Sequence, residues 1–497
     1  MKSKQFLIIP FGRLLFTAAL LNIYSCNSDS SVDPYDDEIF KYDRYHVLSL
    51  IKDKNLRIEV YKQIISMRPD STLEGPHLKF ISTEDIEKIF YLNVSRKNIS
   101  NLEGIGGCKN LMVLVLSENP VKNLSPISAL KKLSDLYINS CKLYDISPLS
   151  ADTSLQLLYA DDNNISNISA LSGLYNLRTV SIMGNRITDI SALENLDNLQ
   201  DVNLRFNSIE DISPLLNKKS LKFLDLNVNR IEGELDLSQW TQLVNFQACQ
   251  NQITKVTGIR DHHYLFSLSL DDNQISEISE ISNLPNLIYL SLSLNKISSV
   301  SASSSIDNIE QLNLYQNRIT DVSFISQMTN LKFLWLGSNT VSDCSLLNSL
   351  KNLEYIQISN NKIKDITFLL NLTSLKHIDI GENNLKNIDT LRFLTELEAL
   401  RISGNLLTNI SLVTNFRHLT LLNVDNNQIE DLSPIKDLEY LNMLEASYNN
   451  IRDLKPLVEC SGMRNPSSLF IMNNPLSDTA KNEQIPLLQS RGVYVLF

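Results

Sequence analysis

The stretch LLNVDNNQIEDLSPIKDLEY, residues 421–440, contains one copy of a sequence pattern that recurs along the chain. Leu422 and Val424 alternate with Leu421, Asn423 and Asp425, which is the period-2 pattern of a short β-strand. The second half begins with DLSP, where a polar residue before Pro starts a turn, and its apolar residues are then three apart, which favours a short helical turn. The stretch therefore predicts one strand and one helical turn per copy.

The pattern returns at a constant spacing. Aligned on L-x-x-L-x-L-x-x-N-x-I, its first position falls on Ile89, and the following copies begin every 22 residues up to Leu441. An eighteenth copy, SLFIMNNPL (468–476), follows a three-residue insertion. Sixteen of the eighteen copies keep Asn at the ninth position, where Lys97 and Cys141 are the exceptions. The amide of this Asn is expected to bond backbone groups where the chain leaves the strand.

A single strand with one apolar face cannot bury itself, whereas a stack of such strands forms a continuous core. The repeat thus predicts an α/β solenoid with a parallel β-sheet on its concave face and short helical or 3-10 turns on its convex face. Residues 232–242 and 255–264 depart from the second-half spelling but keep the spacing. Local irregularity on the convex side is expected there.

These residues resemble the leucine-rich repeat family, in particular the 22-residue form of bacterial internalins. The carriers are the L-x-L core, the Asn column and second halves such as DISPLSADTS (145–154) and DISALENLDN (189–198). The resemblance implies a leucine-rich repeat superhelix with a helical N-terminal cap over 39–88 and about 18 repeats over 89–476. Residues 477–497 would form a C-terminal cap. Ser82 or Thr83 is the expected N-cap of a helix in the first cap.

The N-terminus has the make-up of a secretion signal. A positively charged start precedes the apolar run LLFTAALLNIYSC, which ends at Cys26. This ending resembles a bacterial lipobox, in which the Cys after the cut carries lipid. Residues 1–25 are therefore predicted to be a signal peptide, residues 26–38 an acidic flexible tether, and Cys26 the lipidation site. The protein would be extracytoplasmic and lipid-anchored at the outer membrane or cell surface, with plain secretion as the alternative.

The net charge of the chain limits the classes of partner that it can bind. A net charge of −11 argues against nucleic-acid binding, which needs a basic face to neutralise phosphates. At the strand positions expected to face solvent (2, 3, 5, 7 and 8), repeats 1–17 carry fifteen acidic and seven basic residues. Such a face favours neutral or basic partners.

Aromatic residues gather at the same solvent-facing positions of repeats 10–14. We predict a ligand-binding site formed by Tyr289, Tyr315, Phe333, Trp335, Tyr355 and His377. Tyr and Trp are enriched at binding hot spots and stack on sugars. The alternative is that the rings only cover one another on a sheet, for which aromatics have good propensity. A second, weaker cluster contains Tyr137, Leu157 and Tyr159 beside Asp135, Asp161 and Asp162.

Catalytic and metal-binding functions have little support in the sequence. It contains no G-x-S-x-G, H-E-x-x-H or phosphate-binding Gly-rich loop. The pair His262–His263 and the runs DDNN (161–164) and DDNQ (271–274) lack metal-ligand spacing. We therefore predict no enzyme activity, no cofactor and no metal. The leading hypothesis is a monomeric adhesion or protein-binding protein that holds an extracellular or host protein on its concave face, and a carbohydrate-binding surface lipoprotein is the alternative.

Overall fold

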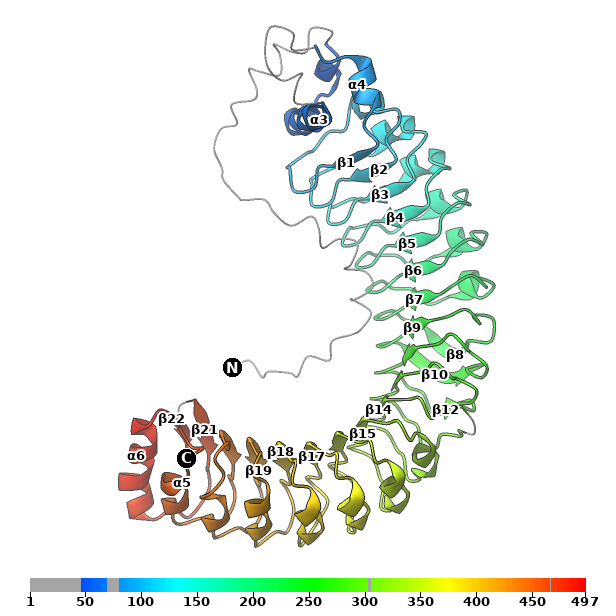
Figure 1. Ribbon diagram of the computed structural model, residues 1–497. Coiled ribbons are helices and arrows are strands. Elements are labelled where there is room, and N and C mark those ends of the chain that lie inside the picture. Colours follow the sequence, from blue (N-terminus) through cyan, green and yellow to red (C-terminus); the bar gives the residue numbers. More distant parts are fainter. Residues whose placement is uncertain (1–45, 69–79, 303–304, 465) are drawn as a thin grey trace. The chain divides into compact units, whose positions relative to one another are not determined.

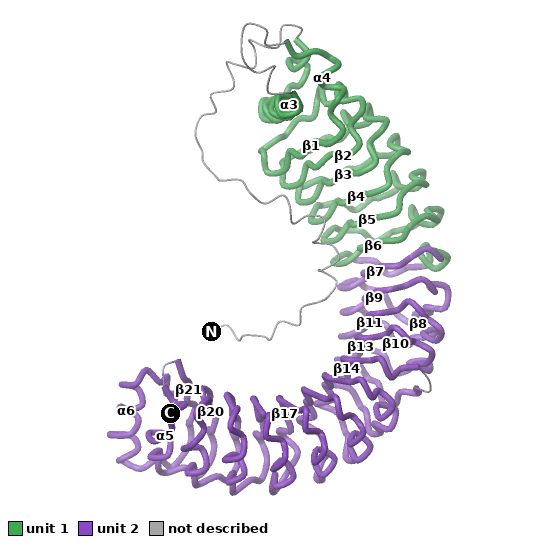
Figure 2. Tube along the Cα trace, in the orientation of Figure 1, with its two compact units in different colours: residues 1–207, 213–218 green, residues 208–212, 219–497 purple. Residues whose placement is uncertain are grey.

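The computed structural model describes residues 46–68, 80–302, 305–464 and 466–497 (Figure 1). The predicted signal peptide, the tether and Cys26 lie outside these ranges. The chain divides into two compact units (Figure 2). Unit 1 comprises residues 1–207 and 213–218, and unit 2 comprises residues 208–212 and 219–497.

Each unit is a stack of short parallel strands that pair in chain order. In unit 1 these are β1 Tyr91–Asn93, β2 Val113–Val115, β3 Asp135–Tyr137, β4 Leu157–Tyr159, β5 Thr179–Ser181 and β6 Asp201–Asn203. In unit 2 they are β7 Phe223–Asp225, β9 Asn245–Gln247, β11 Ser267–Ser269, β13 Tyr289–Ser291, β14 Gln311–Asn313, β15 Phe333–Trp335, β16 Tyr355–Gln357, β17 His377–Asp379, β18 Ala399–Arg401, β19 Leu421–Asn423, β20 Met443–Glu445, β21 Ser467–Phe470 and β22 Val493–Leu496. Within unit 2 the strands follow the inner side of the curve and the helical turns follow its outer side (Figure 1). The predicted parallel sheet on the concave face is confirmed.

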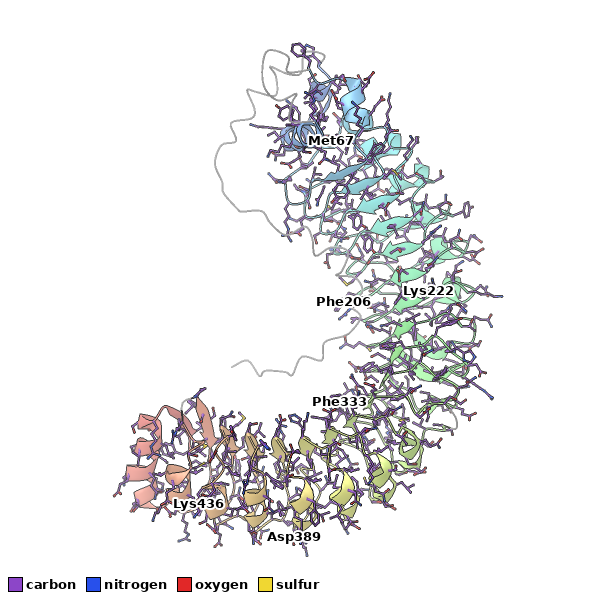
Figure 3. The ribbon with its side chains drawn as sticks, in the orientation of Figure 1. Met67, Phe206, Lys222, Phe333, Asp389 and Lys436 are labelled. Carbon is purple, nitrogen blue, oxygen red and sulfur yellow. The ribbon has the colours of Figure 1, made fainter. Side chains whose placement is uncertain are left out.

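Most strands alternate between the core and solvent, whereas all three residues of β5 are buried. Leu334 and Leu336 are fully buried, whereas Trp335 between them is only partly buried. In Figure 3 the side chain of Phe333 lies on the inner side of unit 2, and those of Asp389 and Lys436 lie on the outer side. The alternation follows from the pleat of a strand, which sends successive side chains to opposite faces.

The Asn column satisfies the backbone where each strand ends. The amide oxygen of Asn339 accepts from the backbone N–H of Ile319 at 2.9 Å, and its nitrogen donates to the carbonyls of Leu314 at 2.9 Å and Leu336 at 3.0 Å. One side chain thus links two repeats through backbone groups that would otherwise be buried unpaired. The predicted role of the column is confirmed. At the Cys141 exception, the thiol reaches the carbonyl of Leu116 at 3.4 Å.

The second halves form the convex turns. Asp145 accepts from the backbone N–H of Ser147 at 2.7 Å and so opens η5. The 3-10 helices of unit 1 are η1 Leu48–Leu50, η3 Ile105–Gly107, η4 Ser125–Ala129, η5 Ser147–Ala151, η6 Ser169–Leu171, η7 Ser191–Leu193 and η8 Ser213–Leu215. Those of unit 2 are η9 Ser323–Gln327, η10 Ser345–Ser349, η11 Thr367–Asn371, η12 Asp389–Phe393, η13 Ser411–Asn415 and η14 Ser433–Ile435.

The expected irregularity on the convex side is a second parallel sheet. Strands β8 Glu232–Asp236, β10 Gln252–Thr257 and β12 Glu277–Ile278 pair in the order β12-β10-β8. They replace the 3-10 turns where the D-I-S-P-L spelling is lost. The register of the main sheet continues unchanged beside them, with Ser267 opposite Asn245.

Helices flank the strands at both ends of the described chain. Helices α3 Lys54–Ser66 and α4 Thr83–Glu87 precede β1, and Ser82 caps α4 through a capping box with Asp85. Helix α5 Lys455–Glu459 precedes β21, and the π-helix η15 Ala480–Gln484 and helix α6 Ile485–Ser490 precede β22. None of the helices in the described ranges has both the length and the apolar character that a bilayer crossing requires.

Candidate functional site

Four of the six predicted site residues form a continuous line of rings on the concave face of unit 2. The ring centroids of Phe333 and Trp335 lie 6.1 Å apart, those of Trp335 and Tyr355 lie 5.2 Å apart, and those of Tyr355 and His377 lie 6.0 Å apart. We call these four residues the aromatic strip. All four side chains are partly buried, so each keeps some contact with solvent.

The register of the sheet explains the strip. Phe333, Tyr355 and His377 are opposite one another on β15, β16 and β17, at repeat position 3. Trp335 is at position 5 of β15 and is opposite Gln357, so its ring reaches diagonally to Tyr355. Neighbouring strands lie about 4.8 Å apart, which suits ring contact between adjacent repeats.

The two other predicted residues lie apart from the strip. Tyr289 on β13 is separated from Phe333 by Gln311 of the intervening strand β14, and it makes no ring contact among the described residues. Burial raises the pKa of Tyr289 to about 12. Tyr315 follows β14 and is 37% exposed. It lines a separate hollow rather than the strip.

Charged residues of alternating sign border the strip at repeat position 2. Lys332 pairs with Glu310 at 3.0 Å, and Lys376 pairs with Glu354 at 3.5 Å. Glu398 continues the row, 4.0 Å from His377. Burial lowers the pKa of His377 although Glu398 opposes the shift. The two Lys–Glu pairs of this border are therefore neutralised within the protein, whereas Glu398 has no Lys or Arg partner among the described residues.

The hollow lies beside the strip, on the side where the strands end. Its volume is about 400 Å³, and its lining includes Tyr315, Asp379, Glu382 and Arg401 together with three serines. Asp379 and Arg401 continue the position-5 row of Trp335 and Gln357. Burial raises the pKa of Asp379 even though the backbone N–H of Gly381 and the charge of Arg401 act against the shift.

Unit 1 contains the second predicted cluster in a different form. Tyr137 and Tyr159 are opposite each other on β3 and β4, with centroids 4.9 Å apart and planes 3° from parallel. Burial raises the pKa of Tyr159 to about 12. The neighbouring Asp161 accepts from the Ser181 hydroxyl at 2.6 Å and from the Met183 backbone N–H at 2.9 Å. Its carboxylate is thus engaged in holding adjacent repeats together.

Candidate metal ligands are likewise engaged in the fold. Asp271 of the DDNQ run accepts from the Ser269 hydroxyl at 2.9 Å and from the backbone N–H of Ser293 at 2.7 Å. His262 is buried, with Nδ1 2.9 Å from the carbonyl oxygen of Ile259 and Nε2 3.1 Å from that of Leu237. In the described part of the chain, no group of three or more His, Cys, Asp or Glu is arranged to hold a metal ion.

The sequence interpretation missed three buried polar residues in the convex halves of the repeats. The residue three positions before the start of a repeat is apolar in most copies. In three copies it is Asp152, Lys218 or His262, each at most 1% exposed. Lys218 donates to Asp197 at 3.0 Å. Neither carboxylate oxygen of Asp152 has a hydrogen-bond partner among the described residues, and burial raises its pKa to about 6. An alignment of the second halves of the repeats, as strict as that of the first halves, would have revealed these polar residues.

Known proteins share both the repeat and its three-dimensional arrangement. A family model of leucine-rich repeats in two copies matches residues 153–195, 176–217, 307–349 and 351–393. The fold is a leucine-rich repeat solenoid. The comparison with curated proteins found no match.

Solved structures of leucine-rich repeat proteins are similar over most of the chain. A leucine-rich repeat protein of Leptospira interrogans is 23% identical, with a TM-score of 0.55, over 84% of this chain and 97% of its own. The functional domain of InlJ from Listeria monocytogenes is 21% identical, with a TM-score of 0.59, over 78% and 77%. The ectodomain of the Arabidopsis receptor kinase HAESA, solved with a peptide hormone ligand, is 21% identical, with a TM-score of 0.60, over 80% and 72%. At these identities the likeness concerns the fold.

Proposed function

We propose that this protein binds a protein partner on the concave face of unit 2, with the aromatic strip as the centre of the contact. The observation that carries this proposal is the strip itself: four contacting rings on three adjacent strands, partly open to solvent. Rigid aromatic side chains provide large contact area at a low cost in conformational entropy, which is why they dominate binding hot spots. Binding rather than catalysis is the role that such a surface supports.

The solenoid architecture supports the same proposal. Stacked repeats create an extended surface on which side chains from many strands can contact one partner. HAESA, which shares the fold, was solved with a peptide hormone ligand. A partner that is a protein or a segment of one therefore fits this face, and adhesion to a host or neighbouring-cell protein is the use we propose.

The experiment is a binding screen of the purified full-length chain against arrays of extracellular proteins and of glycans. We expect saturable binding to a protein that weakens roughly tenfold or more in the Trp335→Ala/Tyr355→Ala variant, because a hot-spot ring contributes at least about 1.4 kcal/mol. The matched control is Tyr137→Ala/Tyr159→Ala, which removes two rings from the concave face of unit 1. It should leave affinity within about twofold.

Two results would replace the proposal. Unchanged affinity in the Trp335→Ala/Tyr355→Ala variant would move the contact away from the strip. Binding to glycans alone would favour a carbohydrate-binding protein, in which the same rings stack on sugars.

We also propose that the protein is lipid-anchored outside the cytoplasm through Cys26, at the outer membrane or cell surface. The support is the sequence of residues 1–26, a charged start and an apolar run that ends at this Cys. Anchoring through one residue is simple to test. The Cys26→Ser variant should move from the membrane fraction to the soluble fraction, and unchanged membrane retention would contradict the anchor.

A further inference from the structure

The concave face of unit 2 is charged unevenly along the direction in which its strands follow one another. From Glu310 to Lys376, acids and bases alternate at repeat position 2 and form the two ion pairs described above. Toward the end of the chain, five acidic residues stand against the single guanidinium of Arg401. We call these five the acidic margin: Asp379, Glu382, Glu398, Asp425 and Glu445.

The acidic margin is only partly neutralised from within the protein, by the charge of Arg401 near Asp379 and Glu445. Among the described residues, none of its carboxylates forms an ion pair with Lys or Arg, and Arg401 forms none either. Their hydrogen bonds come from neutral groups: Asp379 accepts from the Gly381 backbone N–H at 3.2 Å. In the same way, Asp425 accepts from the Ser447 backbone N–H at 2.6 Å.

Partial burial makes the excess of negative charge costly. Burial raises the pKa of Asp425, and burial together with the charge of Asp425 raises that of Glu445. A carboxylate in such surroundings is stabilised by an added positive charge more than one in bulk water, because the screening around it is weaker. A positively charged group of a ligand would therefore supply the counter-charge that these carboxylates lack.

The acidic margin and the aromatic strip form one surface. Asp379 is two strands from Trp335 in the position-5 row, roughly 10 Å at the spacing of a parallel sheet. The charge of Asp379 also contributes, after burial, to the raised pKa of Tyr355. The hollow lined by Asp379, Glu382 and Arg401 lies at this junction. An extended peptide covers roughly 10 Å in three residues.

We propose that the partner contacts this face with a basic segment, in which a Lys or Arg side chain enters the hollow while an apolar side chain within about three residues covers the aromatic strip. This inference rests on the proposed function and deepens it by naming the chemistry of the partner. Charge complementarity selects the basic residue, and the rings select its apolar neighbour. The long apolar stems of Lys and Arg also suit the rim of the strip.

The test uses a random dodecapeptide library selected on the full-length chain, followed by affinity measurements on individual synthetic peptides. The charge variant is Asp379→Asn/Asp425→Asn/Glu445→Gln, which keeps an oxygen acceptor at each position. The matched control, Asp321→Asn/Asp343→Asn/Asp365→Asn, changes the net charge equally on the convex side. There each Asp accepts a hydrogen bond from a backbone N–H at 2.8 Å. In a later repeat Asn409 accepts the equivalent bond at 2.6 Å, so Asn is compatible with this position.

We expect the selected peptides to carry Lys or Arg near an apolar residue. Their affinity should fall roughly tenfold or more in the charge variant and in Trp335→Ala/Tyr355→Ala, stay within about twofold in the convex control, and fall with added salt. If the charge variant does not fold, Glu382→Gln provides the test, because its carboxylate has no hydrogen-bond partner among the described residues. That single change should weaken binding about threefold.

The outcomes separate the inference from the proposed function. Peptides that need Trp335 and Tyr355 but lack basic residues, or that bind the charge variant normally, would overturn the inference and leave the proposed function standing. Peptides that bind Trp335→Ala/Tyr355→Ala normally would contradict both. Equal weakening in the charge variant and the convex control would also overturn the inference, because the effect would then follow net charge alone.

Discussion

Units 1 and 2 carry two different aromatic arrangements at solvent-facing positions of their repeats. In unit 1, Tyr137 and Tyr159 are opposite each other at position 5, so their planes run parallel and each ring covers the other. In unit 2, the position-5 neighbour of Trp335 is Gln357, and the indole turns to Tyr355 with an angle of 39° between the rings. A tilted, diagonal contact covers less of each face than parallel stacking does.

This difference separates a ring that supports the fold from a ring that is available to a partner. Both arrangements satisfy the propensity of a sheet for aromatic residues. Only the strip extends over three strands and borders a hollow. The repeat therefore determines the direction in which a side chain points. Its neighbours at the same and adjacent repeat positions determine whether other side chains cover it or leave it exposed to a partner.

The largest expected effects concern the core beneath both clusters. Leu136→Ala in unit 1 and Leu334→Ala in unit 2 should each destabilise the fold by roughly 2–5 kcal/mol, because both side chains are fully buried and truncation leaves a cavity. Tyr137→Ala and Trp335→Ala, one residue away in each strand, should cost clearly less. Urea denaturation of the four variants checks this. A larger loss from either ring than from its Leu neighbour would reverse the assignment of inside and outside in that unit.

A second effect is expected in unit 1 at the buried Asp152. Burial raises its pKa from the ordinary 3.8 to about 6, so between these values the folded chain holds a proton that the unfolded chain has lost. Stability therefore falls as pH rises through this window, by up to about 3 kcal/mol once the group is ionised in both states. Asp152→Leu should remove this cost, since Leu130 and Leu174 occupy the same repeat position and are fully buried.

Thermal melts at pH 7 and pH 4 measure the Asp152 effect. Asp152→Leu should melt above the parent at pH 7, and the advantage should shrink at pH 4, where the carboxyl is protonated in the folded state. Asp152→Asn is the control that removes the charge but keeps a polar group. An advantage of Asp152→Leu that is equal at both pH values would show that packing, rather than ionisation, sets the cost.

The scaffold was predictable because its signals are local. Alternation around Leu334 and the 22-residue spacing dictate strand, register and core, and an Asn such as Asn339 is required by backbone groups in every repeat. The helix capped at Ser82 was also predicted correctly. Each of these features depends on residues close together in sequence or at one fixed spacing.

The details of the candidate site depended on neighbours that the repeat does not dictate. Tyr289 was grouped with the strip by its repeat position, yet Gln311 on the intervening strand separates it from Phe333. The hollow is formed by residues after several strands, such as Tyr315 and Glu382, whose side-chain directions depend on the turns. The sequence spacing therefore gives the strand and the repeat position of a residue, but not which side chains on neighbouring strands it contacts.

The smallest expected effect is the ring–ring coupling within each cluster, and it sharpens the comparison most directly. Double-mutant cycles with Ala at Tyr137 and Tyr159, and at Trp335 and Tyr355, isolate the interaction energy of each pair from urea denaturation. We expect roughly 0.5–1.5 kcal/mol for the parallel pair and a smaller value for the tilted pair, because stacking area decreases with tilt. A larger coupling at Trp335–Tyr355 than at Tyr137–Tyr159 would mean that the strip, like the pair in unit 1, is mainly self-supporting. Its rings would then have less surface to offer a partner, and the contact would have to rest on the acidic margin.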